Sequence, residues 1–107
     1  MTAPPPSLTI TPPQWAIVQE ILHKHVPHCE VWAFGSRAKG TAKAFSDLDL
    51  AIIAEARLPN GVTAAMADDF TESDLPWKVD IVEWATTSAA FREIIAGDKL
   101  VVQKGGV

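Results

Sequence analysis

The sequence of 107 residues contains no tyrosine, a single cysteine and no apolar run long enough to span a membrane. The single cysteine, Cys29, excludes a disulfide within the chain and is typical of a reducing compartment, so we expect a cytoplasmic protein. Basic residues are scarce, because 9 Lys and Arg stand against 13 Asp and Glu and give a net charge of −4. This balance argues against an extended nucleic-acid surface, which requires a basic face.

The length is that of one domain, and a hydrophobic content of 48% is enough for a modest core. Residues 1–10 include three consecutive prolines and are predicted to form a flexible N-terminal arm. The domain itself is predicted over residues 11–103, followed by a C-terminal tail over 104–107. We expect no room in this chain for an additional substrate-binding domain.

The hydrophobic pattern alternates between helical and strand periods. Thr11 is a suitable N-cap, and the two prolines after it favour the start of a helix that ends at Pro27. Strands are predicted over 30–34, 48–54 and 78–84, a short helix after Gly35, helices starting at 62 and after 88, and a final strand or extended segment over 99–103. Gly97 is predicted to stop the last helix. The fold class is therefore α/β (α+β), a small mixed β-sheet flanked by helices.

The turn after the first predicted strand has the composition of a phosphate-binding loop. Gly35 and Ser36 leave the backbone open to a phosphate, and Arg37 offers a planar fork of donors that suits phosphate oxygens. Lys39 adds a further positive charge, although a lysine in a loop is as often simply solvated. We predict that these four residues bind nucleotide phosphates.

Carboxylates follow on the next two predicted strands. Asp47 and Asp49 are two residues apart, so in a strand both side chains leave the same face, where their repulsion favours a bound cation such as Mg²⁺. Asp80 interrupts an apolar run, which is costly without a partner. If its strand lies beside the first, Asp80 completes a site of three acids; otherwise it is a solvent-facing charge on an edge strand. Asp47, Asp49 and Asp80 are our predicted catalytic residues and metal ligands.

The run Gly35–Gly40 (Gly-Ser-Arg-Ala-Lys-Gly), followed by Ser46–Leu50 (Ser-Asp-Leu-Asp-Leu), resembles the signature of the DNA polymerase beta-like nucleotidyltransferase superfamily. The short length is similar to that of its smallest members, the minimal nucleotidyltransferases (MNT). The resemblance implies the polymerase beta-like fold and an attack by a hydroxyl group on the α-phosphorus of ATP, with two Mg²⁺ ions held by the acids. It also implies that Asp80 serves the acceptor side and that Arg37 neutralises the departing pyrophosphate. Lys39 departs from the arginine common in this loop and gives a point charge instead of a fork.

Minimal members of this family commonly act with a HEPN-domain protein as a toxin–antitoxin pair, in some cases by adenylylating a tyrosine of the toxin. The resemblance therefore implies an antitoxin that transfers AMP to a hydroxyl of a HEPN-type toxin. Because the chain has no tyrosine, it cannot modify itself at that residue, which favours an acceptor supplied in trans. Trp32, Trp77 and Trp84 fit a core, with a role in a partner surface as the second interpretation.

Two further interpretations stay open at this point. The chain could be a non-catalytic antitoxin that occludes its partner, which a measurement of nucleotide turnover would distinguish. It could also modify a small molecule, as relatives that modify aminoglycosides do. That reaction requires an acidic acceptor pocket, for which Asp68, Asp69 and Glu72 are the candidate cluster. Neighbouring positions on a helix diverge, so this cluster fits a solvated face better.

Overall fold

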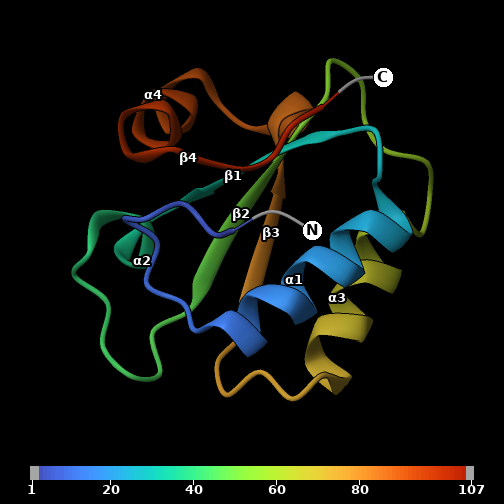
Figure 1. Cartoon of the computed structure of the whole chain (residues 1–107). Coiled ribbons are helices and arrows are strands. Elements are labelled where there is room, and N and C mark those ends of the chain that lie inside the picture. The colour runs from blue at the N-terminus through green and yellow to red at the C-terminus, as the bar shows by residue number, and fades with distance from the viewer. Residues whose placement is uncertain (1–2, 106–107) are drawn as a thin grey trace.

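The computed structural model describes residues 3–105 and contains one four-stranded sheet with helices on both faces (Figure 1). The elements in chain order are α1 (Pro12–His25), β1 (Glu30–Phe34), α2 (Ser36–Lys39), β2 (Leu48–Ile53), α3 (Val62–Glu72), β3 (Val79–Glu83), η1 (Trp84–Thr86), α4 (Ala89–Asp98) and β4 (Leu100–Gln103). The predicted fold class is confirmed, and the last segment, which the sequence left between strand and extended chain, is a strand.

The strand order is β3-β2-β1-β4, with β1 antiparallel to both of its neighbours and β2 parallel to β3. The two sheet faces are covered differently. Helices α1 and α3 pack together on one face, and α4 lies on the other (Figure 1). Because side chains alternate along a strand, Leu48, Leu50 and Ile52 of β2 enter the core beneath α1 and α3, whereas Ala51 packs on the α4 side.

The start of α1 has the predicted cap, but the residues before it differ from the predicted flexible arm. Thr11 and Gln14 form a reciprocal capping box, which satisfies backbone donors at the helix start. Leu8 is 6% exposed and belongs to the main core. The Thr9 N–H donates to the Arg37 carbonyl at 3.0 Å, so residues 8–10 are part of the domain.

The predicted tail also begins inside the domain. A Cβ added at Gly105 would lie 2.6 Å from the Glu30 backbone nitrogen, so this part of the chain packs against the start of β1. Residues 1–2 of the predicted arm and 106–107 of the predicted tail lie outside the described residues.

Several predicted boundaries differ from the structure by one or two residues: β2 ends at Ile53, and β3 and β4 begin at Val79 and Leu100. Helix α4 continues through Gly97 and ends at Asp98, since Gly97 does not adopt the positive φ with which a glycine ends a helix. Strand β3 ends at Glu83 because Trp84 begins the 3₁₀ turn. Across residues 3–105, we find no helix with the length and apolar character needed to cross a membrane.

Candidate active site

The sheet brings the three predicted acids together. β2 begins at Leu48, so Asp47 directly precedes the strand and Asp49 is its second residue. In the parallel ladder between β2 and β3, Asp49 lies directly opposite Asp80. Residues opposite each other in a ladder point to the same sheet face, so the acids gather on the face covered by α4.

The carboxylates of this group raise one another's pKa. Burial, and then the charges of Asp80 and Asp47, raise the pKa of Asp49 to about 6. The pKa of Asp80 is also raised, first by burial and then by a hydrogen bond with Asp47 and the charge of Asp47, while Lys78 acts in the opposite direction. Such an arrangement attracts a cation. Within residues 3–105, no three His, Cys, Asp or Glu side chains form a ready-made metal cage.

The turn between β1 and α2 lies against Asp49. Gly35 has a φ of 75°, and a Cβ added to it would lie 2.3 Å from the Asp49 Oδ2. Both the positive φ and the missing Cβ are therefore required at this position. The Gly35 carbonyl accepts from the N–H groups of Ala38 and Lys39, which closes α2 immediately after the turn. The turn thus places the start of α2, at Ser36, beside the acid on β2.

The side chain of Arg37 does not have the contacts expected of a phosphate-binding group. Arg37 is buried, with 3% of its surface exposed. Its guanidinium donates from Nε to the Ser46 carbonyl at 2.9 Å and from Nη1 to the Thr9 carbonyl at 3.0 Å. Nη2 donates to the Ala44 carbonyl at 3.1 Å and, more weakly, to that of Lys43 at 3.4 Å.

The guanidinium of Arg37 also lies 4.3 Å from the ring centre of Trp77, a cation–π contact. Burial lowers the pKa of Arg37, and the charge of Asp47 opposes this effect. The expectation that Arg37 binds phosphate is corrected by these contacts, because its donors are directed at carbonyls. Arg37 instead ties residue 9 and the loop before Asp47 to the segment before β3.

The remaining basic candidate is Lys39, whose side chain is half exposed and lies 4.0 Å from the Asp98 carboxylate at the end of α4. Among the tryptophans, Trp77 is buried, while Trp32 and Trp84 are half-buried and meet edge to face with ring centres 5.2 Å apart. The sequence analysis missed the contact between Trp77 and Arg37, and no local pattern announces it, because 40 positions separate the two residues.

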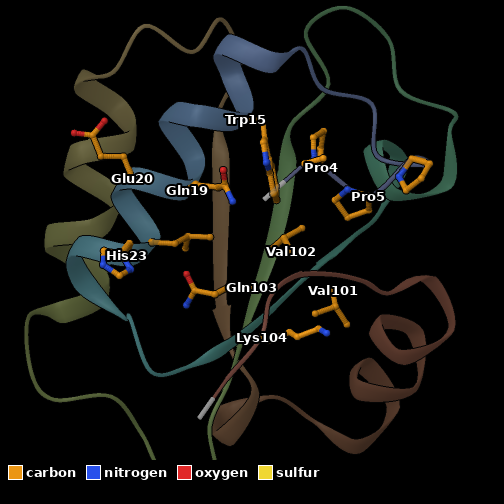
Figure 2. Close-up of a pocket in the computed structure, with 13 residues that line it drawn as sticks. Pro4, Pro5, Trp15, Gln19, Glu20, His23, Val101, Val102, Gln103 and Lys104 are labelled. Atoms are coloured by element: carbon orange, nitrogen blue, oxygen red, sulfur yellow. The ribbon is translucent and has the colours of Figure 1, made fainter. Parts of the chain in front are cut away.

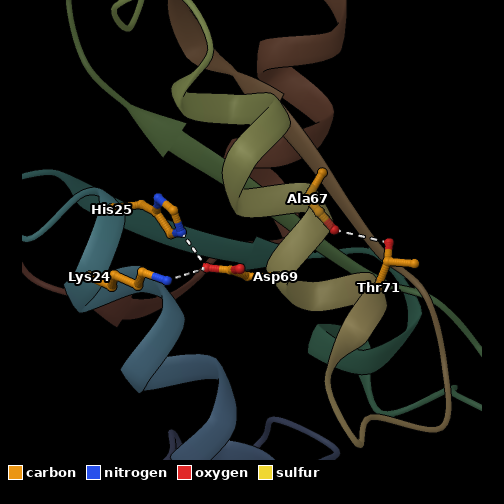
Figure 3. A network of polar contacts seen from close by, with 5 residues as sticks. All are labelled: Lys24, His25, Ala67, Asp69 and Thr71. Carbon is orange, nitrogen blue, oxygen red and sulfur yellow. Dashed lines mark hydrogen bonds and ion pairs between the residues drawn. The ribbon is translucent and has the colours of Figure 1, made fainter.

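The acidic cluster considered as an acceptor pocket lies on α3, across the sheet from the other acids. Asp69 accepts from Lys24 Nζ at 3.0 Å and lies 2.6 Å from His25 Nε2, so it joins α3 to α1 (Figure 3). These contacts lower the pKa of Asp69. Its role is to hold two helices together, which leaves no support for a small-molecule pocket at this cluster.

A hollow of about 1010 Å³ lies between α1, β4 and the proline-rich residues near the N-terminus (Figure 2). Trp15 and Val102 contribute to its apolar wall, and Glu20, His23 and Lys104 lie around it. None of the predicted site residues lines it, so the hollow is separate from the acids.

A turn free of side-chain bulk beside acids on two parallel strands defines a nucleotidyltransferase-type site. Residues 17–105 match the family model described as "Polymerase beta, Nucleotidyltransferase", and this chain belongs to that family. A curated relative, a probable protein adenylyltransferase MntA from Haemophilus influenzae, is 53% identical over 97 residues, which are 91% of this chain and 85% of that protein.

Solved structures share the fold. A toxin–antitoxin complex with AMP-PNP matches with a TM-score of 0.70 and 23% identity, over 87% of this chain and 73% of that chain. A complex of the tri-AMPylated Shewanella oneidensis HEPN toxin with its MNT antitoxin matches with a TM-score of 0.63 and 20% identity, over 87% and 70% of the two chains.

Proposed function

We propose that this chain is a protein adenylyltransferase that moves AMP from ATP to a hydroxyl group of a HEPN-domain toxin and thereby acts as its antitoxin. The observation that carries the proposal is the register that sets Asp49 opposite Asp80 while Gly35 lies against Asp49. It agrees with the 53% identity to the probable adenylyltransferase MntA. The neighbouring complexes with AMP-PNP and with a tri-AMPylated HEPN toxin support the choice of nucleotide and of partner.

In the proposed reaction, the acceptor oxygen forms a bond to the α-phosphorus of ATP, the bond from that phosphorus to the bridging oxygen breaks, and pyrophosphate leaves. Gly35 and Ser36 would bind the phosphates through the open backbone of the turn. Asp80 would accept the proton of the attacking hydroxyl. Lys39, exposed beside the turn, would add a favourable charge for the departing pyrophosphate.

The donor set fits Mg²⁺. Asp47, Asp49 and Asp80 provide hard oxygen ligands, and Mg²⁺ is usually held by one or two carboxylates together with substrate phosphates instead of an all-protein cage. This explains how the site can serve Mg²⁺ although residues 3–105 contain no closed cage. When bound, Mg²⁺ stabilises the charge on the attacking and leaving oxygens. Because the reaction consumes ATP and the chain has one cysteine, we also propose the cytoplasm as its location.

The test is incubation with ATP, MgCl₂ and the protein encoded by the adjacent gene, which we propose to be the HEPN-domain toxin, followed by intact mass measurement of both proteins. We expect the HEPN protein to gain one or more AMP groups with the wild-type chain and none with Asp49→Asn. Asp68→Asn, an exposed acid on α3, is the matched control and should retain transfer. A stable complex without any mass gain would reject transfer and favour the antitoxin that only occludes its partner.

A further inference from the structure

Strand β3 forms one edge of the sheet, because the strand order is β3-β2-β1-β4 (Figure 1). Asp80 is the second residue of β3 and lies on the α4 face, opposite Asp49. We propose that an extended segment of the acceptor protein pairs with the outer edge of β3, so that its hydroxyl-bearing residue lies opposite Asp80. The inference rests on the proposed function and adds to it the way in which the acceptor is bound.

The backbone of β3 has free hydrogen-bonding groups on either side of Asp80. The Leu48 N–H donates to the Lys78 carbonyl at 2.9 Å, so the backbone groups of Lys78 face β2. Because these groups alternate in direction along a strand, those of Asp80 also face β2, whereas those of Val79 and Ile81 face outward. Within the part of the chain that the structure describes, the outward groups of Val79 and Ile81 have no hydrogen-bond partner. They are therefore available to a strand added from another protein.

The residues of β3 are more exposed than those of the neighbouring strand. Leu50, Ala51 and Ile52 of β2 are at most 1% exposed, whereas no residue of β3 is buried. A hollow of about 450 Å³ lies beside the start of β3 and is lined by both Val79 and Asp80. Because these consecutive residues point to opposite sheet faces, the hollow reaches the outer edge of the strand itself. The edge beside Asp80 is therefore open to an added segment.

The direction of the proposed reaction also places the acceptor at β3. The turn that would bind the phosphates follows β1, and Gly35 in this turn lies against Asp49 on β2. Pyrophosphate held at the turn would therefore leave toward β1. Since the attacking and leaving oxygens lie roughly in line on either side of the phosphorus, the attacking hydroxyl comes from the side of β3.

Strand pairing brings the acceptor residue to the acids. In an antiparallel pair with the outer edge of β3, Asp80 occupies a non-hydrogen-bonded position, because its backbone groups face β2. Residues opposite each other at such positions point to the same sheet face, with Cβ atoms about 4.5–5.5 Å apart. The residue opposite Asp80 therefore points to the α4 face, as Asp49 does from the other side. Its hydroxyl oxygen bonds to the α-phosphorus, its proton passes to the Asp80 carboxylate, and pyrophosphate leaves toward the turn.

The two edges of the sheet differ in what pairing would achieve. A segment added to an edge strand binds through its main chain, so its sequence matters mainly where a side chain meets a specific group. At β3 that group is Asp80. The other edge strand, β4, has the sequence Leu-Val-Val-Gln and carries no acid. A segment paired there would bring no hydroxyl group to the acids, so β4 is the natural control for β3.

The first experiment removes one outward donor of β3 and leaves every acid in place. Val79→Pro deletes the outward N–H of the first residue of β3, a position that accepts proline because this group has no partner within the described chain. Leu100→Pro, at the first residue of β4, is the matched control, and Val79→Ala removes the side chain while keeping the N–H. Initial rates of AMP transfer are measured while ATP or the protein encoded by the adjacent gene is varied. Urea unfolding gives the folded fraction of each variant.

For Val79→Pro we expect the KM for the acceptor protein to rise about tenfold or more, through one lost hydrogen bond and a ring that prevents close pairing. The kcat and the KM for ATP should stay within about threefold of wild type, because the acids and the phosphate turn are unchanged. Val79→Ala should raise the KM for the acceptor by less than Val79→Pro does. Leu100→Pro should leave this KM within about twofold of wild type.

Hydrogen exchange gives a second test that needs no substitution. In the isolated chain, the outward amides of Val79 and Ile81 should exchange quickly, whereas the inward amide of Asp80 should be protected. The acceptor protein is then added with MgCl₂ and α,β-methylene ATP, whose bridging carbon prevents release of pyrophosphate. We expect exchange at Val79 and Ile81 to slow by about tenfold or more, while exchange of the β4 amides stays unchanged.

Unchanged exchange at Val79 and Ile81 in the complex would overturn the inference, as would an unchanged acceptor KM in folded Val79→Pro or an equal rise in Leu100→Pro. Protection of these two amides in the isolated chain, together with a dimeric mass in solution, would assign the edge to a second copy of this chain and would also overturn it. If the wild-type chain transfers no AMP, the proposed function itself fails. That result is distinct from equal transfer by the wild type and Val79→Pro, which rejects only the pairing at β3.

Discussion

The two faces of the sheet are built for different purposes. The face under α1 and α3 carries the larger core, with Val31, Leu50, Ile52 and Met66 each at most 1% exposed. The buried core of the α4 face consists of Phe34, Ala51 and Ile95. On this second face, the acids occupy the positions that apolar side chains fill on the first. The first face provides stability through burial, and the second gives up part of that stability to hold charges together.

Neighbouring residues of β2 show the difference most directly. Asp49 and Leu50 are consecutive, yet the pleat sends them to opposite faces. Leu50 is fully buried in the main core, whereas burial, and then the charges of Asp80 and Asp47, raise the pKa of Asp49 to about 6. The comparison predicts that substitutions at these two positions separate activity from stability, and the predictions below test it from the largest expected effect to the smallest.

Asp49→Asn should lower the rate of AMP transfer by about 10²–10³-fold or more, the size expected for loss of one electrostatic group at a reacting centre. The free energy of unfolding should be unchanged or higher, because the substitution relieves repulsion among the acids. Transfer is followed by intact mass and stability by urea unfolding. Full transfer activity in Asp49→Asn would mean that the acids are not the reacting site.

Leu50→Ala should show the reverse pattern. Removing a fully buried leucine costs about 2–5 kcal/mol, through lost burial and the cavity that remains. Transfer per folded molecule should stay within a few-fold of wild type at low temperature. Urea unfolding and the rate normalised to the folded fraction give the two values. A loss of transfer as large as that of Asp49→Asn in fully folded protein would break the separation of the faces.

Arg37→Ala tests the correction made for this residue. Loss of the bonds to the Thr9, Ala44 and Ser46 carbonyls should lower the free energy of unfolding by about 2 kcal/mol. Arg37→Lys should recover less than half of this loss, since one ammonium group cannot reproduce the fork. Lys39→Ala, with a half-exposed side chain, is the control and should change stability by less than about 0.5 kcal/mol.

If Arg37 bound phosphate after all, Arg37→Ala would raise the KM for ATP strongly while leaving the unfolding curve in place. The combination of a displaced unfolding curve and a smaller kinetic effect is the pattern that the contacts of Arg37 predict.

The pH dependence of stability should give the smallest effect. The pKa of Asp49 is raised from 3.8 to about 6, so between these pH values the folded protein holds a proton that the unfolded chain has released. In the absence of Mg²⁺, the free energy of unfolding should therefore fall as the pH rises from about 4 to about 6, by about 1 kcal/mol for a partly solvated group. The raised pKa of Asp80 acts in the same direction.

Asp49→Asn lacks the titrating group and should show a distinctly flatter profile over this range. Urea unfolding at a series of pH values, in buffers with a chelator, provides the measurement. A wild-type curve that rises with pH as steeply as it is predicted to fall would show that the acids are not held against one another.

Much of the sheet and of the acid group could be predicted before the structure was known. The bounds of β1 agree with the predicted strand, and β2 differs from its prediction by one residue. The spacing of Asp47 and Asp49, together with Asp80 in an apolar run, was enough to propose one site. What the sequence could not supply was the neighbour of β3, which decides between a third site acid and an edge charge. The parallel ladder supplies that neighbour: β3 pairs with β2 and Asp80 lies opposite Asp49, as the three-acid interpretation requires, while β3 is also an edge strand on which Asp80 is exposed.

The role of Arg37 could not be predicted, because a guanidinium satisfies carbonyl and phosphate oxygens equally well and the loop sequence is compatible with both. The partners of Arg37 come from residue 9, from the loop before Asp47 and from Trp77. Contacts between segments this far apart follow from how the elements pack. The same is true of Leu8, which joins the core although the prolines before it suggested a loose arm.

The sequence by itself determined the helical or strand periodicity of the apolar residues in each element, the small-residue turn after β1, and the spacing of the candidate site acids. All of these depend on positions along the chain. The tertiary structure decided which face each strand presents, the meeting of Asp49 with Asp80 and the burial of Arg37. The physical reason is that burial and charge interactions depend on distances in space, and strand order and register fix those distances only after the whole sheet has formed.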